Sequence, residues 1–558
     1  MSFLYFFKSY TLSKPLARNM KKYFILLILF LTPLVNSIYP QVHQDWVARY
    51  DYSNQVDVAL AIAVDSSGNV YVTGESGFPS DIATIKYNSL GIQEWVARYN
   101  GPGSHHDVCY AIDVDLHGNV YVTGATGSPA DIIVIKYNHL GVQQWVKTYN
   151  GPHNYIDYAY SIAVDNDGNV YVGGTTTWDG VGRDFVTIKL DSIGITQWVT
   201  LYGEGGFTVD VCFSLKVDQA GNVFVTGFGS GGSTMSDYKT IKYDSAGIQQ
   251  WVSTYNGPMS RVDQAWSMVI DEFSNVYVTG QSEGIGTNND YATVKYNSDG
   301  EQQWVARYND TANLQDIASS IAVDTFGNVY VTGKSRSDSG NYETDYATIK
   351  YNPSGEEQWV VRYEQAGRED HPPLLVTDVN NNVYITGNCG SSPFSYDYAT
   401  IKYNTLGVEQ WVTKYNGPQD SADYAFAIAV DAKGNVYVTG TENNYIFTNS
   451  IYATIKYSQT IVNTSISAET PEDYNLYQNY PNPFNPTTKI RYQIQKSEFV
   501  KLTVFNILGN EIESLVNQRL QPGIFEVKWD ASKYSSGTYF YRLTAGDFSE
   551  IRKMLLIK

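Results

Sequence analysis

One short phrase, Gly-Asn-Val-Tyr-Val-Thr-Gly, recurs eight times along the chain with small substitutions, at spacings of 50 to 54 residues. A repeat of this length predicts an array of similar structural units, and it constrains the fold more than any other feature. A residue that occurs eight times is expected to build the unit and not to perform chemistry. The phrase begins at Gly68, Gly118, Gly168, Gly221, Ser274, Gly327, Asn381 and Gly434.

Each repeat contains four short segments with the pattern of β-strands. In the first repeat these are residues 61–65, 70–73, 83–87 and 93–99, separated by turns and loops that contain glycine. None of the segments has a helical period. The 47 tyrosines and 46 glycines of the chain suit many short strands joined by tight turns.

Eight four-stranded units of this length predict an all-β fold, an eight-bladed β-propeller over residues 42–457. An open β-solenoid is the alternative. A strand around Trp46 precedes the first complete unit, whereas the last unit ends with residues 453–457, one strand short. We therefore expect the Trp46 strand to become the outer strand of the last blade and to close the ring.

The repeats resemble the SBBP family of bacterial β-propeller repeats. The matching residues are the eight Val-Asp-x-x-Gly-Asn-Val-Tyr-Val-Thr-Gly phrases and their Ala-Thr-Ile-Lys-Tyr-Asn partners, over about residues 42–457. The resemblance implies a propeller in an extracytoplasmic location. It does not imply one activity.

Residues 1–41 are interpreted as an N-terminal extension and a secretory signal peptide. Met20 is a better start than Met1, because two lysines, an apolar run over residues 23–35 and the small residue Ser37 follow it. The run is shorter than the roughly 20 residues that a membrane-spanning helix needs. A membrane anchor is the alternative.

A different module follows the repeats. Residues 458–473 are rich in Ser, Thr and Glu and are predicted to be a linker, and the alternating segments of residues 474–558 predict a small β-sandwich. Turns at residues 508–510 and 521–523 separate some of these segments.

Residues 474–558 closely resemble the type A sorting domain of the type IX secretion system. The motifs are Tyr-Pro-Asn-Pro-Phe-Asn-Pro at 480–486, Val-Phe-Asn-Ile-Leu-Gly at 504–509, Ser-Gly-Thr-Tyr-Phe-Tyr-Arg-Leu at 536–543 and the terminal Lys-Met-Leu-Leu-Ile-Lys. The resemblance implies that the type IX secretion machinery is a partner, and that the protein is secreted or held on the outer surface of a Gram-negative cell after the domain is cleaved. A purely structural sandwich is the alternative.

The composition excludes one class of partner and leaves others open. The formal net charge of −19 and the pI of about 4.8 disfavour nucleic-acid binding. The three cysteines do not predict a disulfide framework. We expect a monomer, no cofactor and no catalytic residue. The protein is interpreted as a binding module, with a polysaccharide-active enzyme or a structural adhesion protein as alternatives.

Three aspartates recur in the repeat, as Asp57, Asp65 and Asp81 do in the first unit. Asp65 opens the first hairpin turn, where its carboxylate can accept turn amides, so we expect a structural role. Strand alternation places Asp57 and Asp81 on the same face of the propeller. They could accept hydrogen bonds from loop amides, or they could bind a cation such as calcium.

The loops between the second and third strands differ most in length and sequence, and they lie on the face that carries Asp57 and Asp81. Variable loops on a rigid scaffold often carry binding sites, and exposed aromatic residues suit sugar or protein ligands. The alternative is that these loops merely cover the mouth of the channel. The candidate ligand-binding residues are Trp178, Tyr342, Phe394, Tyr396, Tyr445, Phe447, Asp57 and Asp81.

Overall fold

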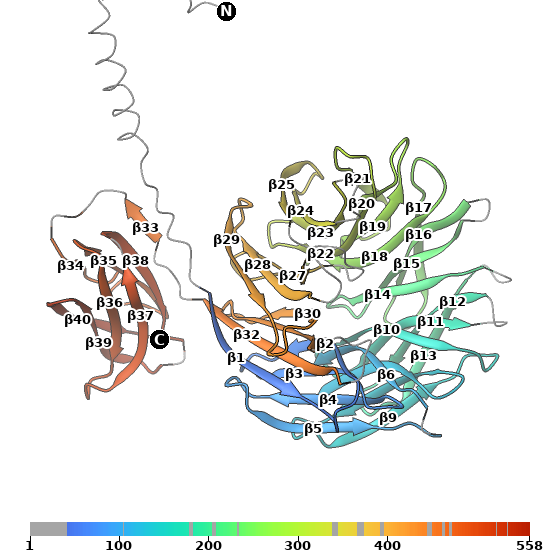
Figure 1. Cartoon of the computed structure of the whole chain (residues 1–558), viewed down its shortest axis with the longest axis horizontal. Helices are drawn as coiled ribbons and strands as arrows, with labels where there is room; N and C mark the ends of the chain where they lie inside the picture. Colours follow the sequence, from blue (N-terminus) through green and yellow to red (C-terminus); the bar gives the residue numbers. More distant parts are fainter. Residues whose placement is uncertain are drawn as a thin grey trace, which may run out of the picture.

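The computed structural model describes a chain of β-strands and turns (Figure 1). Its described residues contain no helix, and hence no helix long and apolar enough to cross a membrane. The predicted signal peptide lies outside the described residues. These are residues 42–558 without 104, 178–181, 204–207, 232–233, 338–343, 365–372, 391–394, 443–448, 460–463, 468–470, 472, 521 and 533.

Eight four-stranded antiparallel sheets, here called blades, are built from the repeats that the structure describes. Each of the first seven consists of four strands that are consecutive in the sequence. The first four blades are β2 (Asp57–Val64), β3 (Val70–Ser76), β4 (Asp81–Tyr87) and β5 (Gln93–Tyr99); β6 (Val108–Val114), β7 (Val120–Thr126), β8 (Asp131–Tyr137) and β9 (Gln143–Tyr149); β10 (Asp157–Val164), β11 (Val170–Thr177), β12 (Arg183–Leu190) and β13 (Thr196–Tyr202); β14 (Val211–Val217), β15 (Val223–Gly231), β16 (Thr234–Tyr243) and β17 (Gln249–Tyr255).

The next three blades repeat this arrangement, and the closing blade takes one strand from the beginning of the propeller. They are β18 (Asp263–Ile270), β19 (Val276–Glu283), β20 (Asn289–Tyr296) and β21 (Gln302–Tyr308); β22 (Asp316–Val323), β23 (Val329–Ser335), β24 (Asp345–Tyr351) and β25 (Glu357–Tyr363); β26 (Leu374–Thr377), β27 (Val383–Cys389), β28 (Asp397–Tyr403) and β29 (Glu409–Tyr415); and β30 (Tyr424–Val430), β31 (Val436–Glu442) and β32 (Ile451–Gln459) with β1 (Val42–Tyr50).

The blades form a closed ring. The first strand of each blade contacts the first strand of the next, and β30 contacts β2. β1 pairs antiparallel with β32, with Trp46 opposite Lys456 and Tyr50 opposite Tyr452 (Figure 1). The predicted closure by the Trp46 strand is therefore confirmed, and the all-β propeller with a following sandwich is the observed fold class.

The two ends of each blade differ, and we name the two faces of the ring accordingly. The turn face carries the tight turns between the first and second and between the third and fourth strands. In the first of these turns Gly68 has φ +81° and donates its N–H to the Asp65 carbonyl at 2.9 Å. The loop face carries the longer connections, including those between blades.

The turn aspartate has the structural role that was predicted. The carboxylate of Asp65 accepts the N–H groups of Ser67 and Asn69 at 2.9 Å, the Asn69 side-chain amide at 2.7 Å and the Tyr71 hydroxyl at 3.0 Å. The same bonds recur around Asp115, Asp165, Asp271, Asp324, Asp378 and Asp431. This turn is a building element of the blade and not a ligand site.

Neighbouring blades are joined by a recurring Trp–Lys contact. In the first blade, Trp95 Nε1 donates to the His139 carbonyl of the second blade at 3.1 Å, and Lys86 Nζ lies 5.5 Å from the centre of the Tyr71 ring. At the closure, Trp46 Nε1 and Lys456 Nζ donate to the Ser89 carbonyl at 3.2 and 3.3 Å. The closing blade thus makes the usual junction with the first blade. Its junction with the seventh blade differs, because Lys402 donates to the Gln459 side chain and Trp411 Nε1 has no hydrogen-bond partner among the described residues.

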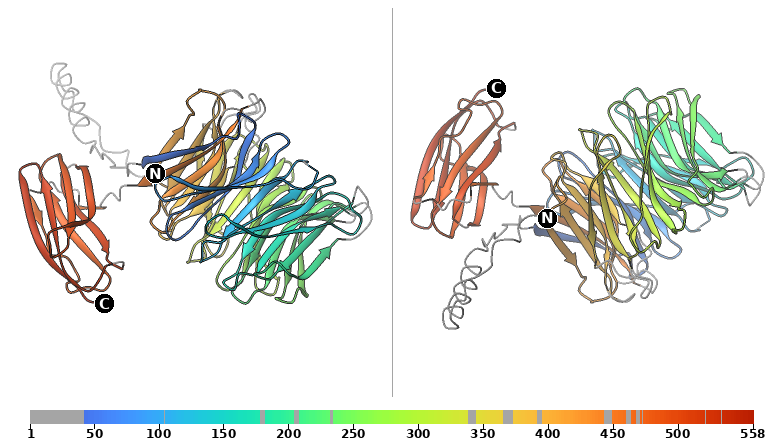
Figure 2. Two further views of the ribbon diagram at one scale, coloured as in Figure 1. Left: turned by 90° about the horizontal axis from the view of Figure 1, so that it is seen from below. Right: turned by 90° about the horizontal axis from the view of Figure 1, so that it is seen from above.

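The C-terminal module is a β-sandwich whose sheets enclose a separate core that includes Trp529 and Tyr541 (Figure 2). β33 lies within the predicted linker and pairs with β38, so the sandwich begins earlier than residue 474. Its two sheets are β33 (Thr464–Ser467), β38 (Gly523–Asp530), β35 (Thr487–Ile494) and β34 (Asn475–Leu476), and β37 (Glu511–Leu520), β36 (Glu498–Phe505), β39 (Gly537–Ala545) and β40 (Phe548–Leu556).

Candidate functional site

The two predicted aspartates lie together on the loop face. Asp57 is opposite Ser76 in the neighbouring strand, and Ser76 is opposite Asp81. Asp57 is 0% exposed and accepts the Tyr52 N–H at 2.7 Å, and burial raises its pKa to about 6. Asp57 therefore fixes the connection between blades. No group of three His, Cys, Asp or Glu side chains suited to a metal ion occurs in the described part of the chain.

Most of the predicted loop aromatics cannot be placed. Trp178, Tyr342, Phe394, Tyr445 and Phe447 lie outside the described residues. Tyr396 is described, and the expectation that it is exposed is wrong, because it is 2% exposed and packs on Tyr424 with the ring centres 5.7 Å apart. It belongs to a small buried cluster at the loop face.

Arginine clusters anchor the loop face on one side of the ring. In the first blade, Arg98 donates to the Tyr50 hydroxyl at 2.9 Å, to Ser76 Oγ at 2.5 Å and to Asp81 at 2.9 Å. Asp81 is thus paired with the guanidinium of Arg98 within the same blade. Equivalent clusters surround Arg307 in the fifth blade and Arg362 in the sixth.

The closing blade has a different version of this cluster. Ile451 occupies the position of Asp81, and the carboxylate comes instead from Glu442 on the neighbouring strand, whose side chain is 2% exposed. Glu442 accepts Arg49 Nε at 2.9 Å and the Tyr415 hydroxyl at 2.6 Å. The departure of the last repeat from the aspartate pattern is therefore compensated within the same blade.

The second, third and fourth blades have no arginine at this position. Thr148, Leu201 and Thr254 stand at the position of Arg98, as the pairing with the third strands shows. In the fourth blade Lys239 approaches from the adjacent strand, and its Nζ lies 3.4 Å from Thr254 Oγ1. The repeats that are uniform on the turn face are thus not uniform on the loop face.

These three blades and the fifth blade carry an aromatic surface that the sequence analysis missed. The first strand of seven blades contains a β-bulge near the loop face. The bulge changes the direction in which the side chain of the extra residue points. Four consecutive bulge residues are aromatic, and we call them the aromatic arc: Tyr110, Tyr160, Phe213 and Trp266. The signal was present, since the bulge residue immediately precedes the apolar run of each repeat, but it appears only when that one position is compared between repeats.

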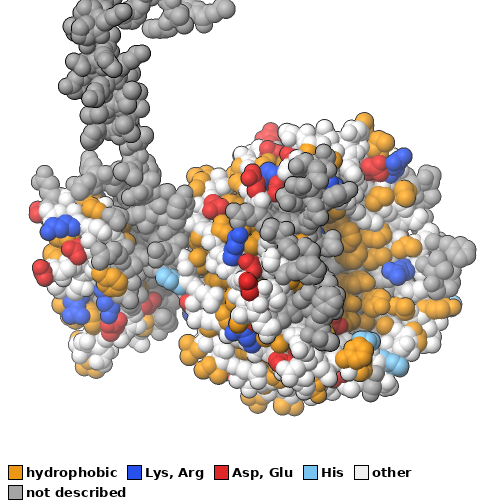
Figure 3. Space-filling model, viewed as in Figure 1, with side chains coloured by type: hydrophobic (Ala, Val, Ile, Leu, Met, Phe, Trp, Pro, Cys, Tyr) orange, Lys and Arg blue, Asp and Glu red, His pale blue; other side chains and the backbone are white. Residues whose placement is uncertain are grey.

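The rings of the aromatic arc contact one another from blade to blade. The ring centres of Tyr110 and Tyr160 are 5.5 Å apart, those of Tyr160 and Phe213 5.4 Å, and those of Phe213 and Trp266 4.7 Å. Tyr158 and Phe228 pack beside them. All six rings are partly exposed, and Figure 3 shows hydrophobic side chains gathered on the inner wall over β14 and β15.

Polar groups accompany the aromatic arc. The hydroxyls of Tyr110, Tyr158 and Tyr160 form no hydrogen bond with any described residue, and none of them is a buried unpaired atom. Burial raises the pKa of Tyr110 and of Tyr160, so both phenols are neutral near pH 7. The arc therefore presents apolar ring faces together with neutral hydroxyl groups.

The wall of the channel also carries two polar residues that break the repeat pattern. Asp113 and Lys216 occupy the position of Ala63 on the first strands of the second and fourth blades. Asp113 accepts the N–H groups of Val114 and Val164 at 2.8 Å, which caps the edge of the next blade.

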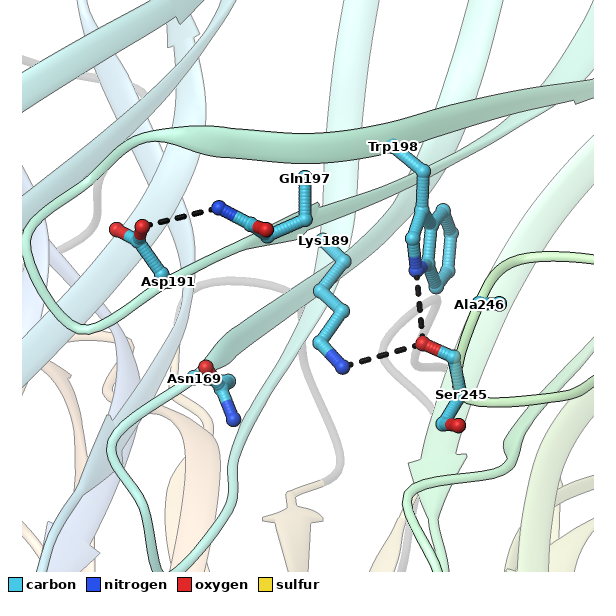
Figure 4. A pocket seen from close by; sticks show the side chains of 7 residues that line it. All are labelled: Asn169, Lys189, Asp191, Gln197, Trp198, Ser245 and Ala246. Carbon is cyan, nitrogen blue, oxygen red and sulfur yellow. Dashed lines mark hydrogen bonds between the residues drawn. The ribbon is translucent and has the colours of Figure 1, made fainter.

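A pocket of about 380 Å³ opens on the turn face between the third and fourth blades (Figure 4). Its polar groups bond one another: Lys189 Nζ and Trp198 Nε1 both donate to the Ser245 carbonyl at 3.2 Å, and Gln197 donates to Asp191 at 2.9 Å. These are the groups of the recurring blade junction. The pocket is a variant of that junction, with few free donors for a ligand.

Two family models match the chain. The secretion system C-terminal sorting domain matches residues 478–558, and the beta-propeller repeat matches residues 46–79, 94–129, 144–179, 303–341 and 410–448. The chain carries beta-propeller repeats and a type IX sorting domain. The repeat protein is therefore secreted or located at the cell surface, and its C-terminal domain connects it to the secretion machinery.

Individual relatives are distant. An uncharacterized WD repeat-containing protein of Acanthamoeba polyphaga mimivirus is 30% identical over 176 residues, a match that covers 24% of this chain and only 12% of that protein. PorZ, a surface component of the type IX secretion system of Porphyromonas gingivalis, is 14% identical, with 90% of this chain and 66% of PorZ covered and a TM-score of 0.38. A polysaccharide lyase is 12% identical, with 64% and 91% covered and a TM-score of 0.40.

Proposed function

We propose that this secreted propeller is a binding module that holds its ligand at the loop face, against the aromatic arc. The observation that carries the proposal is the contrast between a nearly symmetric frame and one asymmetric aromatic surface. Partly exposed aromatic rings with a few polar groups are the usual lining of ligand sites. The loop aromatics Trp178 and Tyr445 lie outside the described residues and remain sequence predictions.

The proposal is tested by screening the full chain against glycan and protein arrays. A variant with Tyr160→Ala and Phe213→Ala should lose the ligand that the unmodified chain captures. The matched control, Leu60→Ala with Phe426→Ala, changes two bulge residues outside the arc and should retain it. Capture that survives in the arc variant but not in the control would contradict this assignment.

The role of the C-terminal domain in export is tested separately. Deletion of residues 474–558 should leave the propeller in the periplasm of cells with an active type IX pathway, because the sorting signal is then missing. Fractionation and immunoblotting measure the location. Mass spectrometry of the exported protein tests whether the domain is cleaved, and an intact Lys558 on exported protein would count against cleavage.

A further inference from the structure

The aromatic arc combines two properties that few ligand classes match at once. Its rings offer apolar faces in a continuous row across four blades, and three tyrosine hydroxyls along that row have no partner among the described residues. A lipid would leave the hydroxyls without partners, at a cost in free energy. A sugar ring has an apolar C–H face and a rim of hydroxyl groups, so it can stack on a ring and hydrogen-bond beside it.

A chain of amides ends beside the arc on the fifth blade. Asn289 Nδ2 donates to Gln281 Oε1 at 3.0 Å, and Gln281 Nε2 donates to Gln264 Oε1 at 2.6 Å. Gln264 lies two residues before Trp266 on β18, and its own NH2 group donates to no described residue. The relay fixes the orientation of Gln264, which leaves two N–H donors available to an oxygen-rich ligand.

The charges around the arc favour a neutral ligand. The charged groups that act on its phenols are one carboxylate, Glu75 near Tyr110, and one guanidinium, Arg183 near Tyr160. The chain as a whole carries a formal charge of −19, which repels acidic polysaccharides.

The length of the arc sets the size of the ligand. The bulge residues on either side of it are Leu60 and Ser319, and Ser319 Oγ is already bonded to the Pro373 carbonyl at 2.6 Å. The aromatic arc therefore ends on both sides and extends over four consecutive blades. A single sugar would cover only part of it.

We propose that the aromatic arc binds a neutral oligosaccharide chain, with consecutive sugars stacked along Tyr160, Phe213 and Trp266 and with Gln264 bonded to hydroxyls at one end. This inference rests on the proposed binding function and adds the chemical class of the ligand. The tyrosine hydroxyls contribute to orientation, and the rings supply most of the contact area.

The test uses the full chain and soluble oligosaccharides as probes. Dimers to hexamers of β-1,4-linked glucose, mannose, xylose and N-acetylglucosamine are titrated by calorimetry, with oligogalacturonates as the acidic comparison. For at least one neutral series, affinity should rise with length and level off at about four sugars. Each acidic probe should bind more weakly than a neutral probe of equal length.

Variants then locate the site. Trp266→Ala and Phe213→Ala should each weaken binding roughly tenfold or more, since each removes a ring on which a sugar stacks. Tyr160→Phe should weaken it roughly threefold to tenfold through the lost hydroxyl. Phe426→Ala, a bulge residue outside the arc, should leave binding unchanged. Trp266→Phe, which keeps an aromatic ring, serves if Trp266→Ala does not fold.

The outcomes separate this inference from the proposed function. Neutral probes that bind equally well to Trp266→Ala, Phe213→Ala and the unmodified chain would overturn the site. Capture of only a protein or an acidic glycan, lost in the arc variants, would overturn the neutral-glycan inference and leave the binding function standing. Absence of any ligand in the arrays and the titrations would overturn both.

Discussion

The two sides of the propeller ring use the same backbone for different purposes. In the first, fifth, sixth and closing blades an arginine on the outer strand bonds a carboxylate, a tyrosine hydroxyl or both on the loop face. In the second to fourth blades this arginine is absent, and the bulges of the inner strands carry aromatic side chains instead. The aromatic arc therefore begins on the blades that lack the arginine and ends at Trp266 on the fifth blade, which has both features.

This difference shows which parts of a repeat protein must stay the same for stability and which parts can differ between repeats. The turn face is nearly identical in all blades, because each turn must form the same hydrogen bonds for its blade to pack. On the loop face, one side keeps a set of structural bonds, which frees the other side to vary. The following predictions test this division, starting with the largest effect.

Glu442→Ala should lower the free energy of unfolding of the propeller by about 3 kcal/mol, because it removes the buried carboxylate that accepts both Arg49 Nε and the Tyr415 hydroxyl. Glu442→Gln keeps an acceptor for Arg49 and should cost less. Urea unfolding followed by tryptophan fluorescence measures both. Equal losses in the two variants would mean that the charge of Glu442 does not stabilise the closing blade.

Arg362→Ala should cost about 2 kcal/mol, since Arg362 bonds Asp345, Ser335 and Tyr308 with only a fifth of its side chain exposed. Thr148→Ala, the same position on the aromatic side, should change stability by less than about 0.5 kcal/mol. Chemical denaturation of both variants measures the two losses of stability. Similar losses at the two positions would remove the distinction between the sides.

The loop-face aspartates should make stability depend on pH on both sides. Burial raises the pKa of Asp57, on the arginine side, and of Asp210, on the aromatic side, to about 6 from 3.8. Between these values the folded protein holds a proton that the unfolded chain has released, so this contribution to stability is present at low pH and is lost as the pH rises through about 6.

Asp57→Asn and Asp210→Asn should therefore each gain about 1 kcal/mol over the unmodified chain at pH 7, with the gain vanishing near pH 4. Denaturation at several pH values gives the slope. Arg98 lowers the pKa of Asp57, whereas Asp184 raises that of Asp210. Arg98→Ala should consequently shift the pH range in which Asp57 affects stability to higher pH. If the stability of Asp57→Asn or Asp210→Asn changes with pH as steeply as that of the unmodified chain, that aspartate is not the source of the pH dependence.

The smallest effects are expected in the channel. Asp113→Ala should cost about 0.5 to 1 kcal/mol, because channel water can replace its bonds to the Val114 and Val164 amides. Lys216→Ala should be within about 0.5 kcal/mol of the unmodified chain, since burial, which lowers the pKa of Lys216, opposes its attraction to Asp113. Thermal melting ranks the two, and a larger loss at Lys216 would point to a structural bond that the geometry does not show.

The period of the repeat was sufficient to predict the four-stranded units and the closure by the Trp46 strand, and the alternating segments after the repeats predicted the sandwich. These features depend on local turn chemistry and strand alternation, which single residues such as Gly68 and Asp65 express directly. The linker was placed wrongly over residues 464–467, because a short edge strand of Thr, Ser and Ile has the composition of a loop.

The candidate site was harder to predict for a physical reason. Asp57 and Asp81 were assigned to a ligand face, yet their partners belong to the fold: the Tyr52 N–H comes from the connection before β2, and Arg98 comes from the strand paired with that of Asp81. The aromatic arc depends on a bulge, which shifts one side chain out of the alternation that the sequence pattern assumes. Contacts between equivalent residues of adjacent blades are invisible within one repeat.

The pairing of β1 with β32 has a consequence for the order in which the molecule is assembled. Asp45 and Ser458, which bond across this pair, are 413 positions apart in the sequence. The chain is synthesised from its N-terminus, so β1 has no partner strand until the first seven blades and then β32 have been made. The sorting domain follows β32 in the sequence. The export signal is therefore made only after the last segment needed for closure, so a chain that displays it already contains every strand of its ring.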